Sequence, residues 1–337
     1  MIQFSIFLPV RNGWPYVQEC VESILRQSYP HFELNVLDNQ SSDNTLIWLR
    51  GIRDPRVRIW TSLTALSIEQ SWARVKNMGK REFMTLIGHD DILDEGYLSA
   101  ICALIERHPD SALYQTGSRL INSAGRKIRS CRAVPEREDA AQYLRARFTF
   151  ERDVFGTGYV MRSSDYDRVG GIPPFEKLFF ADDALWLSLM RGSYKACDAA
   201  ELFGVRIHPK SESASLPSAW SSILKSLSQF AQFLQGYVAE DEACSAVAAS
   251  LEPSFLLAYH RNAYIYALIE ACQAGRPIVP AVVQQISSSL EQAAPSVSGD
   301  LRRSVKIALL EALNASPLRS LVPVLWRMYY RLKTRSQ

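Results

Sequence analysis

A pair of adjacent carboxylates, Asp90 and Asp91, offers the clearest chemistry in this chain of 337 residues. The pair follows an apolar run at residues 83–87, and the stretch LIGHDDIL contains no Lys or Arg. Two carboxylates this close repel each other and raise each other's pKa, whereas a hard divalent cation would neutralise both. A surface turn that caps a helix beginning near Glu95 is the alternative. Because an apolar, strand-like run leads directly into the pair, we favour the cation site.

The elements that must position this pair follow a repeated strand–helix pattern. Apolar, β-prone runs are followed by segments with apolar residues at helical spacing, and strands that alternate with helices indicate an α/β fold with a doubly wound, mostly parallel sheet. The predicted strands are residues 4–10, 32–37, 57–60 and 83–87, and a predicted helix covers residues 68–78.

Polar clusters follow three of these strands, around Asn12, Asp38 and Asp90. Ligands of doubly wound sheets bind at the carboxyl ends of the strands, so we expect the three clusters to converge. Asp38 ends a buried strand, where a carboxylate is costly unless it is hydrogen-bonded. Its alternative role is to cap the next helix, which Asp43 or Ser41 could do equally well, and we favour a functional role.

The loop after the first strand is PVRNG, residues 9–13. It contains neither GxGxxG nor GxxxxGK[ST], so neither a Rossmann dinucleotide site nor a P-loop is supported. A nucleotide would have to be held in another way.

Composition excludes several other classes of protein. The formal net charge of +3 is too small to indicate a nucleic-acid partner. The six cysteines have no CxxC pair and no zinc-ligand spacing. Because the chain begins without a secretory signal and no apolar stretch approaches about 20 residues, we expect a cytoplasmic protein, soluble or peripheral at the inner face of a membrane.

The character of the sequence changes after about residue 215, where apolar residues recur at helical spacing without a catalytic cluster. We therefore predict two domains, residues 1–215 and an α-helical region at residues 216–337. The final segment could be a basic amphipathic helix on an anionic membrane or the last helix of a bundle. Its apolar face would hold Leu321, Leu325, Met328 and Leu332, its charges Arg327, Arg331, Lys333 and Arg335, and its flanks Trp326, Tyr329 and Tyr330.

Five motifs carry a resemblance to a known family: SIFLPVRNG, NVLDNQSSDNT, EFMTLIGHDDIL, GYVMRSSDYDRVGGI and FFADDALWLSL. In residue type, order and spacing they resemble the motif series of the family 2 glycosyltransferases, whose GT-A fold binds nucleotide sugars. The resemblance spans about residues 3–215. It implies that Asp38 accepts a hydrogen bond from the nucleotide base, and that Pro9, Val10 and Asn12 cradle the base and ribose. Trp72, His89 and Asp90 complete the implied donor site, although Trp72 fits a core aromatic equally well.

The resemblance also implies a site for Mg²⁺ or Mn²⁺. Asp90 matches the coordinating acid of the family's Asp-x-Asp pattern, while Gly88 stands where the first acid usually is. We predict Asp91 and His208 as further ligands; a lone histidine such as His208 is as often structural.

The resemblance places a general base at Asp182, within a motif that is usually Glu-Asp-x-x-Leu-Trp and here has Ala181 in place of the glutamate. A sugar hydroxyl needs such a base as it attacks. Asp183 is the alternative base, and both acids could also simply suit a helix N-terminus. The segment Gly156, Thr157 and Gly158 resembles the lining of the acceptor pocket.

The resemblance thus implies an inverting, metal-dependent glycosyltransferase that uses a UDP- or dTDP-linked donor and a saccharide or lipid-linked saccharide acceptor, in bacterial-type surface polysaccharide synthesis. A sugar nucleotidyltransferase is one alternative, but residues 9–12 lack its Gly- and Arg-rich phosphate loop. A non-catalytic carbohydrate-binding or scaffold protein is the other, because acids are missing at Gly88 and Ala181.

Overall fold

The computed structural model describes residues 1–208 and 219–326, which fall into two compact units. The first unit comprises residues 1–143 and 151–207, and the second comprises residues 144–150 and the described residues from 208 onward. The predicted domain boundary at residue 215 lies outside the described residues, as do Met328, Leu332 and most of the predicted basic tail.

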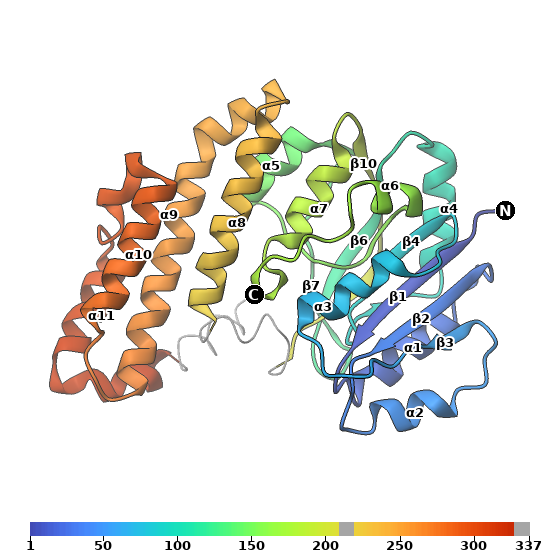
Figure 1. The fold of residues 1–337 in the computed structure, drawn as a ribbon, viewed down its shortest axis with the longest axis horizontal. Helices are drawn as coiled ribbons and strands as arrows, with labels where there is room; N and C mark the ends of the chain where they lie inside the picture. The colour runs from blue at the N-terminus through green and yellow to red at the C-terminus, as the bar shows by residue number, and fades with distance from the viewer. Residues whose placement is uncertain (209–218, 327–337) are drawn as a thin grey trace. The chain divides into compact units, whose positions relative to one another are not determined.

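The first unit is built on one mixed sheet (Figure 1), in which β3, β2, β1 and β4 lie side by side and are parallel. The four predicted strands are therefore confirmed. Beyond β4 the sheet continues with strands that the sequence did not reveal: β9 is antiparallel to both of its neighbours, β4 and β6, and β10 runs parallel to β6. The strands in spatial order are β3 (Val57–Ile59), β2 (Phe32–Asp38), β1 (Phe4–Val10), β4 (Phe83–Leu86), β9 (Tyr159–Arg162), β6 (Leu113–Ile121), β10 (Tyr194–Arg206) and β5 (Ile92–Leu93), with β7 (Lys127–Ser130) paired to β6 and β8 (Arg137–Asp139) to β10.

Helix α1 (Tyr16–Leu25) buries the stripe Val17, Cys20, Val21 and Ile24 in the same core cluster as strands β1 and β2. Fully burying an aliphatic side chain of this size stabilises the fold by about 2 kcal/mol, so this stripe holds α1 against the core of the sheet. The other helices with residues in this unit are α2 (Thr45–Gly51), α3 (Ile68–Ala73), α4 (Tyr97–Arg107), α5 (Ala140–Phe148), α6 (Ser163–Arg168) and α7 (Ala181–Met190), with the 3₁₀ segment η2 (Glu176–Leu178) before α7.

The helix predicted over residues 68–78 is shorter than expected. After α3 the chain tightens into a 3₁₀ segment, η1 (Arg74–Asn77), and Met78 is extended. Such tightening is common at helix ends, and it directs the side chain of Arg74 toward the carboxyl end of β2.

The second unit is helical, as predicted. Helix α8 (Trp220–Val238) buries Ile223, Leu224, Leu227 and Phe230, and it packs against α9 (Glu242–Gln273). The unit continues with α10 (Pro280–Ala293), η4 (Pro295–Asp300), α11 (Val305–Ala315) and η5 (Pro317–Leu321). Within residues 1–208 and 219–326, every helix is too short or too polar to cross a membrane.

Candidate active site

The loops after β1 and β2 are tied together at the carboxyl edge of the sheet. Asn12, in a left-handed conformation with φ 53°, donates its backbone N–H to Ser41 Oγ at 2.9 Å and accepts from the backbone N–H of Ser42 at 2.8 Å. The backbone N–H of Asn39 donates to Val10 at 2.8 Å. The predicted donor-binding residues Pro9, Val10, Asn12 and Asp38 therefore do lie together.

Asp38 ends β2 and has no solvent exposure. Its Oδ1 accepts the backbone N–H of Ser41 at 3.3 Å. Its Oδ2 is buried and accepts no hydrogen bond from any described residue. A buried carboxylate oxygen left without a donor is costly, so this atom points to a donor that a ligand supplies.

Arg74 binds the main chain at Asp38. Its guanidinium donates to the Asp38 carbonyl at 3.2 Å and to the Trp60 carbonyl at 2.6 Å. Burial lowers the pKa of Arg74, and the nearby Asp38 charge opposes that change. Sequence reasoning concentrated on Trp72, which is partly buried on α3, and missed this role of Arg74; the only signal was a basic residue near the end of a predicted helix.

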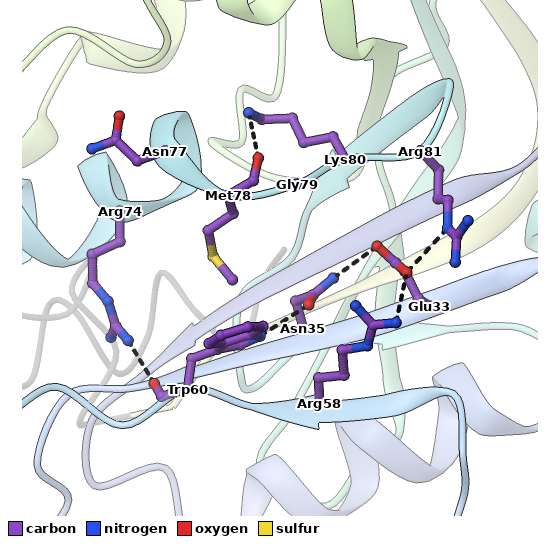
Figure 2. Close-up of a pocket in the computed structure, with 10 residues that line it drawn as sticks. All are labelled: Glu33, Asn35, Arg58, Trp60, Arg74, Asn77, Met78, Gly79, Lys80 and Arg81. Atoms are coloured by element: carbon purple, nitrogen blue, oxygen red, sulfur yellow. Dashed lines mark hydrogen bonds and ion pairs between the residues drawn. The ribbon is translucent and has the colours of Figure 1, made fainter.

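A pocket of about 670 Å³ adjoins Arg74 (Figure 2). Its lining includes Glu33 and Asn35 of β2 and the 3₁₀ segment η1. Its charges are largely satisfied within the protein: Arg58 and Arg81 share Glu33 at 3.9 and 3.0 Å. It holds no predicted site residue. The lining residues are Glu33, Asn35, Arg58, Trp60, Arg74, Asn77, Met78, Gly79, Lys80 and Arg81.

The two acids of the first pair have different surroundings. Asp91 is 5% exposed, and its oxygens accept from Thr157 Oγ1 at 3.0 Å and from the backbone N–H of Arg206 at 3.2 Å. Burial and the neighbouring Asp90 charge raise the pKa of Asp91 to about 8, as the sequence predicted for such a pair. Asp90 is partly exposed, so of the two it is the acid better placed to meet a ligand.

The same turn fits a cation that takes most of its ligands from a substrate. Within the described parts of the chain, three or more His, Cys, Asp or Glu side chains nowhere gather into a metal-binding group. Mg²⁺ commonly binds through one or two carboxylates plus phosphate oxygens and water, which the Asp90 turn could accommodate. His208 is buried in the second unit, and its predicted role as a metal ligand stays a prediction.

Arg206, the last residue of β10, holds the turn at Asp90 and Asp91 through hydrogen bonds. It is 2% exposed and donates from Nε to the Asp90 carbonyl at 2.7 Å and from Nη2 to Glu19 Oε2 at 2.6 Å. Its Nη1 donates to the carbonyls of Asn122 and Ser123 at 3.2 and 3.1 Å. The sequence showed only an arginine near a predicted site and gave no indication of these partners.

Two glycines show how closely the edge loops approach one another. A Cβ on Gly13 would lie 2.7 Å from His89 Cδ2, so the loop after β1 contacts the acidic turn. A Cβ on Gly88 would lie 2.9 Å from Asp91 Oδ2 and 3.0 Å from Asp90 Oδ1. The three polar clusters predicted from the sequence thus converge at one edge.

The predicted acceptor segment connects the two acidic pairs. Thr157 bonds Asp91, and a Cβ on Gly156 would lie 3.6 Å from Asp182 Oδ2. Gly158 has φ +79°, and a Cβ there would lie 2.4 Å from the Phe203 ring, so a side chain is excluded. The backbone N–H of Gly158 donates to the Leu86 carbonyl of β4 at 3.1 Å, which anchors the segment at the sheet edge.

The second acidic pair begins helix α7. Asp183 is 1% exposed and accepts a hydrogen bond from Tyr143 Oη at 2.6 Å. Asp182 is partly exposed and lies beside Gly156. Trp186, one turn further along, packs on the Tyr159 ring with 4.4 Å between centroids.

The segment before α7 is strained. Lys177, Leu178 and Phe180 have φ of 54°, 58° and 59°, a region that costs about 1 kcal/mol or more for each non-glycine residue. The backbone N–H of Lys177 donates to Glu69 Oε1 on α3 at 2.7 Å. One hydrogen bond therefore links the helix that leads to Arg74 with the segment that leads to Asp182.

Comparison with known proteins gives a consistent result. The family model described as glycosyl transferase family 2 matches residues 5–169. The Escherichia coli UDP-Glc:alpha-D-GlcNAc-diphosphoundecaprenol beta-1,3-glucosyltransferase WfgD is 26% identical over 110 residues, which are 33% of this chain and 44% of WfgD. The chain spans less than half the length of the curated relatives it matches.

Two solved structures share the fold. TarS 1–349 of S. aureus in complex with UDP-GlcNAc has a TM-score of 0.64 at 15% identity, covering 97% of this chain and 92% of that one. The mannosyltransferase PcManGT of Pyrobaculum calidifontis, in complex with GDP-Man and Mn²⁺, has a TM-score of 0.55 at 13% identity, covering 96% and 87%. At these identities the likeness establishes the GT-A-like fold.

Proposed function

The chain belongs to glycosyltransferase family 2, and from that membership we propose that it is an inverting enzyme that transfers a sugar from a nucleotide-sugar donor to a hydroxyl of a saccharide or lipid-linked saccharide. The observation that carries the proposal is the buried Oδ2 of Asp38, which lacks a donor among the described residues at the edge where Asn12, His89 and Asp90 converge.

The chemistry of that oxygen requires a base that donates a hydrogen bond. A carboxylate accepts hydrogen bonds and donates none, so the N3–H of uracil or thymine fits it, as does the N1–H of guanine, and of these we propose UDP- or dTDP-linked sugars. The name of WfgD and the TarS complex, both of which refer to UDP-linked sugars, support this choice. Arg74 donates a hydrogen bond to the Asp38 backbone carbonyl and so fixes the main chain that carries the Asp38 carboxylate.

Asp90 would hold the Mg²⁺ or Mn²⁺ that offsets charge on the leaving diphosphate; the Mn²⁺ of PcManGT supports that cofactor. Arg206 keeps the Asp90 main chain in place, and Thr157 and the Arg206 backbone keep Asp91 turned inward. We therefore assign Asp91 to the support of the turn and Asp90 to the donor.

We propose Asp182 as the general base. The acceptor oxygen attacks the anomeric carbon as the bond from that carbon to the diphosphate oxygen breaks, the diphosphate leaves with the electron pair, and the hydroxyl proton passes to Asp182. A single displacement inverts the configuration. Asp182 is the partly exposed acid beside Gly156, whereas Asp183 is bonded to Tyr143 in the core.

Binding of UDP, dTDP, GDP and ADP, with and without Mn²⁺, tests the donor assignment by calorimetry. The Asp38→Asn side chain has only one acceptor oxygen, so its N–H₂ group must face a donor, either the backbone N–H of Ser41 or the N–H of the base. UDP should therefore bind about 10-fold more weakly or worse. Asp165→Asn, on α6 and paired with Arg168, is the matched control. Unchanged UDP affinity in Asp38→Asn would refute the donor site.

The two alternatives make different predictions. A non-catalytic binder would bind UDP but would not convert a UDP-sugar to UDP in the presence of acceptor. A nucleotidyltransferase would form a sugar nucleotide from a sugar phosphate and a nucleoside triphosphate.

The metal assignment is tested at Asp90. Asp90→Ala should abolish the gain in UDP affinity that Mn²⁺ provides. If that gain persists in full, Asp90 is not the ligand.

A further inference from the structure

Helix α11 in the second unit is apolar on both of its faces. Ile307 and Leu310 are buried, yet the exposed positions include Val305, at 89%, and Leu309, at 60%. A surface helix of a globular protein normally presents charged and polar residues to water. The remaining exposed positions of α11 are Lys306, Ala308, Ala312 and Ala315.

The apolar surface continues beyond α11. Segment η5 contacts α11, and Val322 is buried while Leu321, Val324 and Leu325 are exposed. Fourteen large hydrophobic side chains are exposed among the described residues, and six of them lie within residues 305–325. Such clustering marks an interaction surface rather than scattered exposure. We call this the terminal surface: Val305, Leu309, Leu318, Leu321, Val324 and Leu325.

The charge around the terminal surface has one dominant sign. The described residues 301–326 contain four Lys or Arg and one acid, Glu311, a net +3 that equals the formal charge of the whole chain. Glu311 is bound by Arg302 at 2.5 Å and by Tyr264 Oη at 2.5 Å. Lys306 lies over the Trp326 ring at 4.7 Å, so a cation and an aromatic ring, a pair typical of lipid–water interfaces, stand together at this surface.

We propose that the terminal surface binds the polar face of an anionic lipid membrane. Apolar side chains at the centre enter the headgroup region while the surrounding Lys and Arg attract anionic headgroups. The excess of positive charge favours a membrane over a second copy of this chain as the partner, because two positively charged surfaces would repel each other. The apolar area alone would not distinguish the two.

Sedimentation of the full-length protein with vesicles tests this. Binding to vesicles of phosphatidylcholine with phosphatidylglycerol should exceed binding to phosphatidylcholine alone by about 10-fold and should weaken as salt is added. Leu309→Glu with Leu321→Glu should reduce binding to anionic vesicles by about 10-fold or more. Ile47→Glu with Ile128→Glu, which alters exposed apolar residues of the first unit, should leave binding unchanged.

Three results would overturn the proposal. The first is undiminished vesicle binding by the double variant Leu309→Glu with Leu321→Glu, and the second is equal binding of the wild type to neutral and anionic vesicles. The third is a wild-type dimer in light scattering that becomes a monomer in the same double variant. Leu309→Gln with Leu321→Gln repeats the test without added charge. The inference goes beyond the proposed transferase function and is independent of it, since UDP affinity should be unchanged in all of these variants. A wild-type protein that binds vesicles but not UDP would refute the function and leave the membrane surface standing.

Discussion

The two acidic pairs look alike in the sequence, but the hydrogen bonds that hold their inward acids come from different parts of the protein. In both, one carboxylate turns into the protein and the other stays partly exposed: Asp91 bonds Thr157 and the Arg206 backbone, and Asp183 bonds Tyr143. The inward acid comes second in each pair. Support for Asp91 is mostly local to the sheet edge, whereas support for Asp183 comes from the core. Adjacent acids therefore need not share a task, because one can hold the other in place.

The largest expected effect is at Asp182. Asp182→Asn keeps the shape of the side chain but removes the base, so transfer should slow by about 10²–10⁴-fold while UDP affinity, measured by calorimetry, stays the same. Asp183→Asn should slow transfer far less at a temperature where it remains folded. The reverse order of the two variants would make Asp183 the base and end the parallel between the pairs.

The next effect concerns Asp91 and pH, in protein freed of divalent cations. Its folded pKa of about 8 lies above its ordinary value near 3.8, so the folded state retains a proton that the unfolded state loses. Stability from this group is fully present below about pH 4 and is lost as pH rises toward 8, by at most about 1.4 kcal/mol per pH unit. Urea unfolding at pH 5, 6, 7 and 8 measures the slope.

Asp91→Asn, which resembles the protonated acid, should flatten that slope, and Asp165→Asn should leave it unchanged. An identical slope in wild type and Asp91→Asn would show that Asp91 is ionised in the folded protein and that its inward hydrogen bonds suffice to keep it so.

Tyr143→Phe isolates the support of the second pair. It leaves a buried oxygen of Asp183 without its 2.6 Å donor, which should lower the free energy of unfolding by about 1–3 kcal/mol. Thermal and urea unfolding measure the change. Tyr97→Phe, which removes a buried hydroxyl donor to the Gly158 carbonyl, is a matched control for the loss of a hydroxyl. An unchanged stability in Tyr143→Phe would mean that Asp183 needs no support from the core.

The smallest effect is expected at Glu69, whose carboxylate accepts the Lys177 N–H. Glu69→Ala should leave the strained segment before α7 without this hydrogen bond, lower the free energy of unfolding by about 1 kcal/mol and slow sugar transfer a few-fold. Glu69→Gln retains an acceptor oxygen and should behave like wild type. Hydrogen exchange at residues 175–180 follows the segment directly; equal exchange in the two variants would show that Glu69 does not hold it.

The sequence was sufficient where local pattern and topology decide the outcome. Alternating strands and helices place Asn12, Asp38 and Asp90 at one sheet edge, because the carboxyl ends of parallel strands meet there. It was insufficient where tertiary contacts decide. Arg206 reaches Asp90 across 116 residues and Arg74 reaches Asp38 across 36, and an arginine's partners leave no local pattern. Strand β9 runs antiparallel between β4 and β6, a pairing that residue periodicity does not encode.

Gly88 limits which side chains can stand beside the first acidic pair. In the family's Asp-x-Asp pattern the first acid would stand at this position, but a Cβ here would meet Asp91 Oδ2 at 2.9 Å and Asp90 Oδ1 at 3.0 Å. An aspartate at position 88 would therefore require both carboxylates to shift, and Thr157 holds the Asp91 carboxylate where it is. With the side chains placed as they are here, an acid at position 88 and the inward-turned Asp91 exclude each other, so this turn can present Asp90 but not a second acid two residues before it.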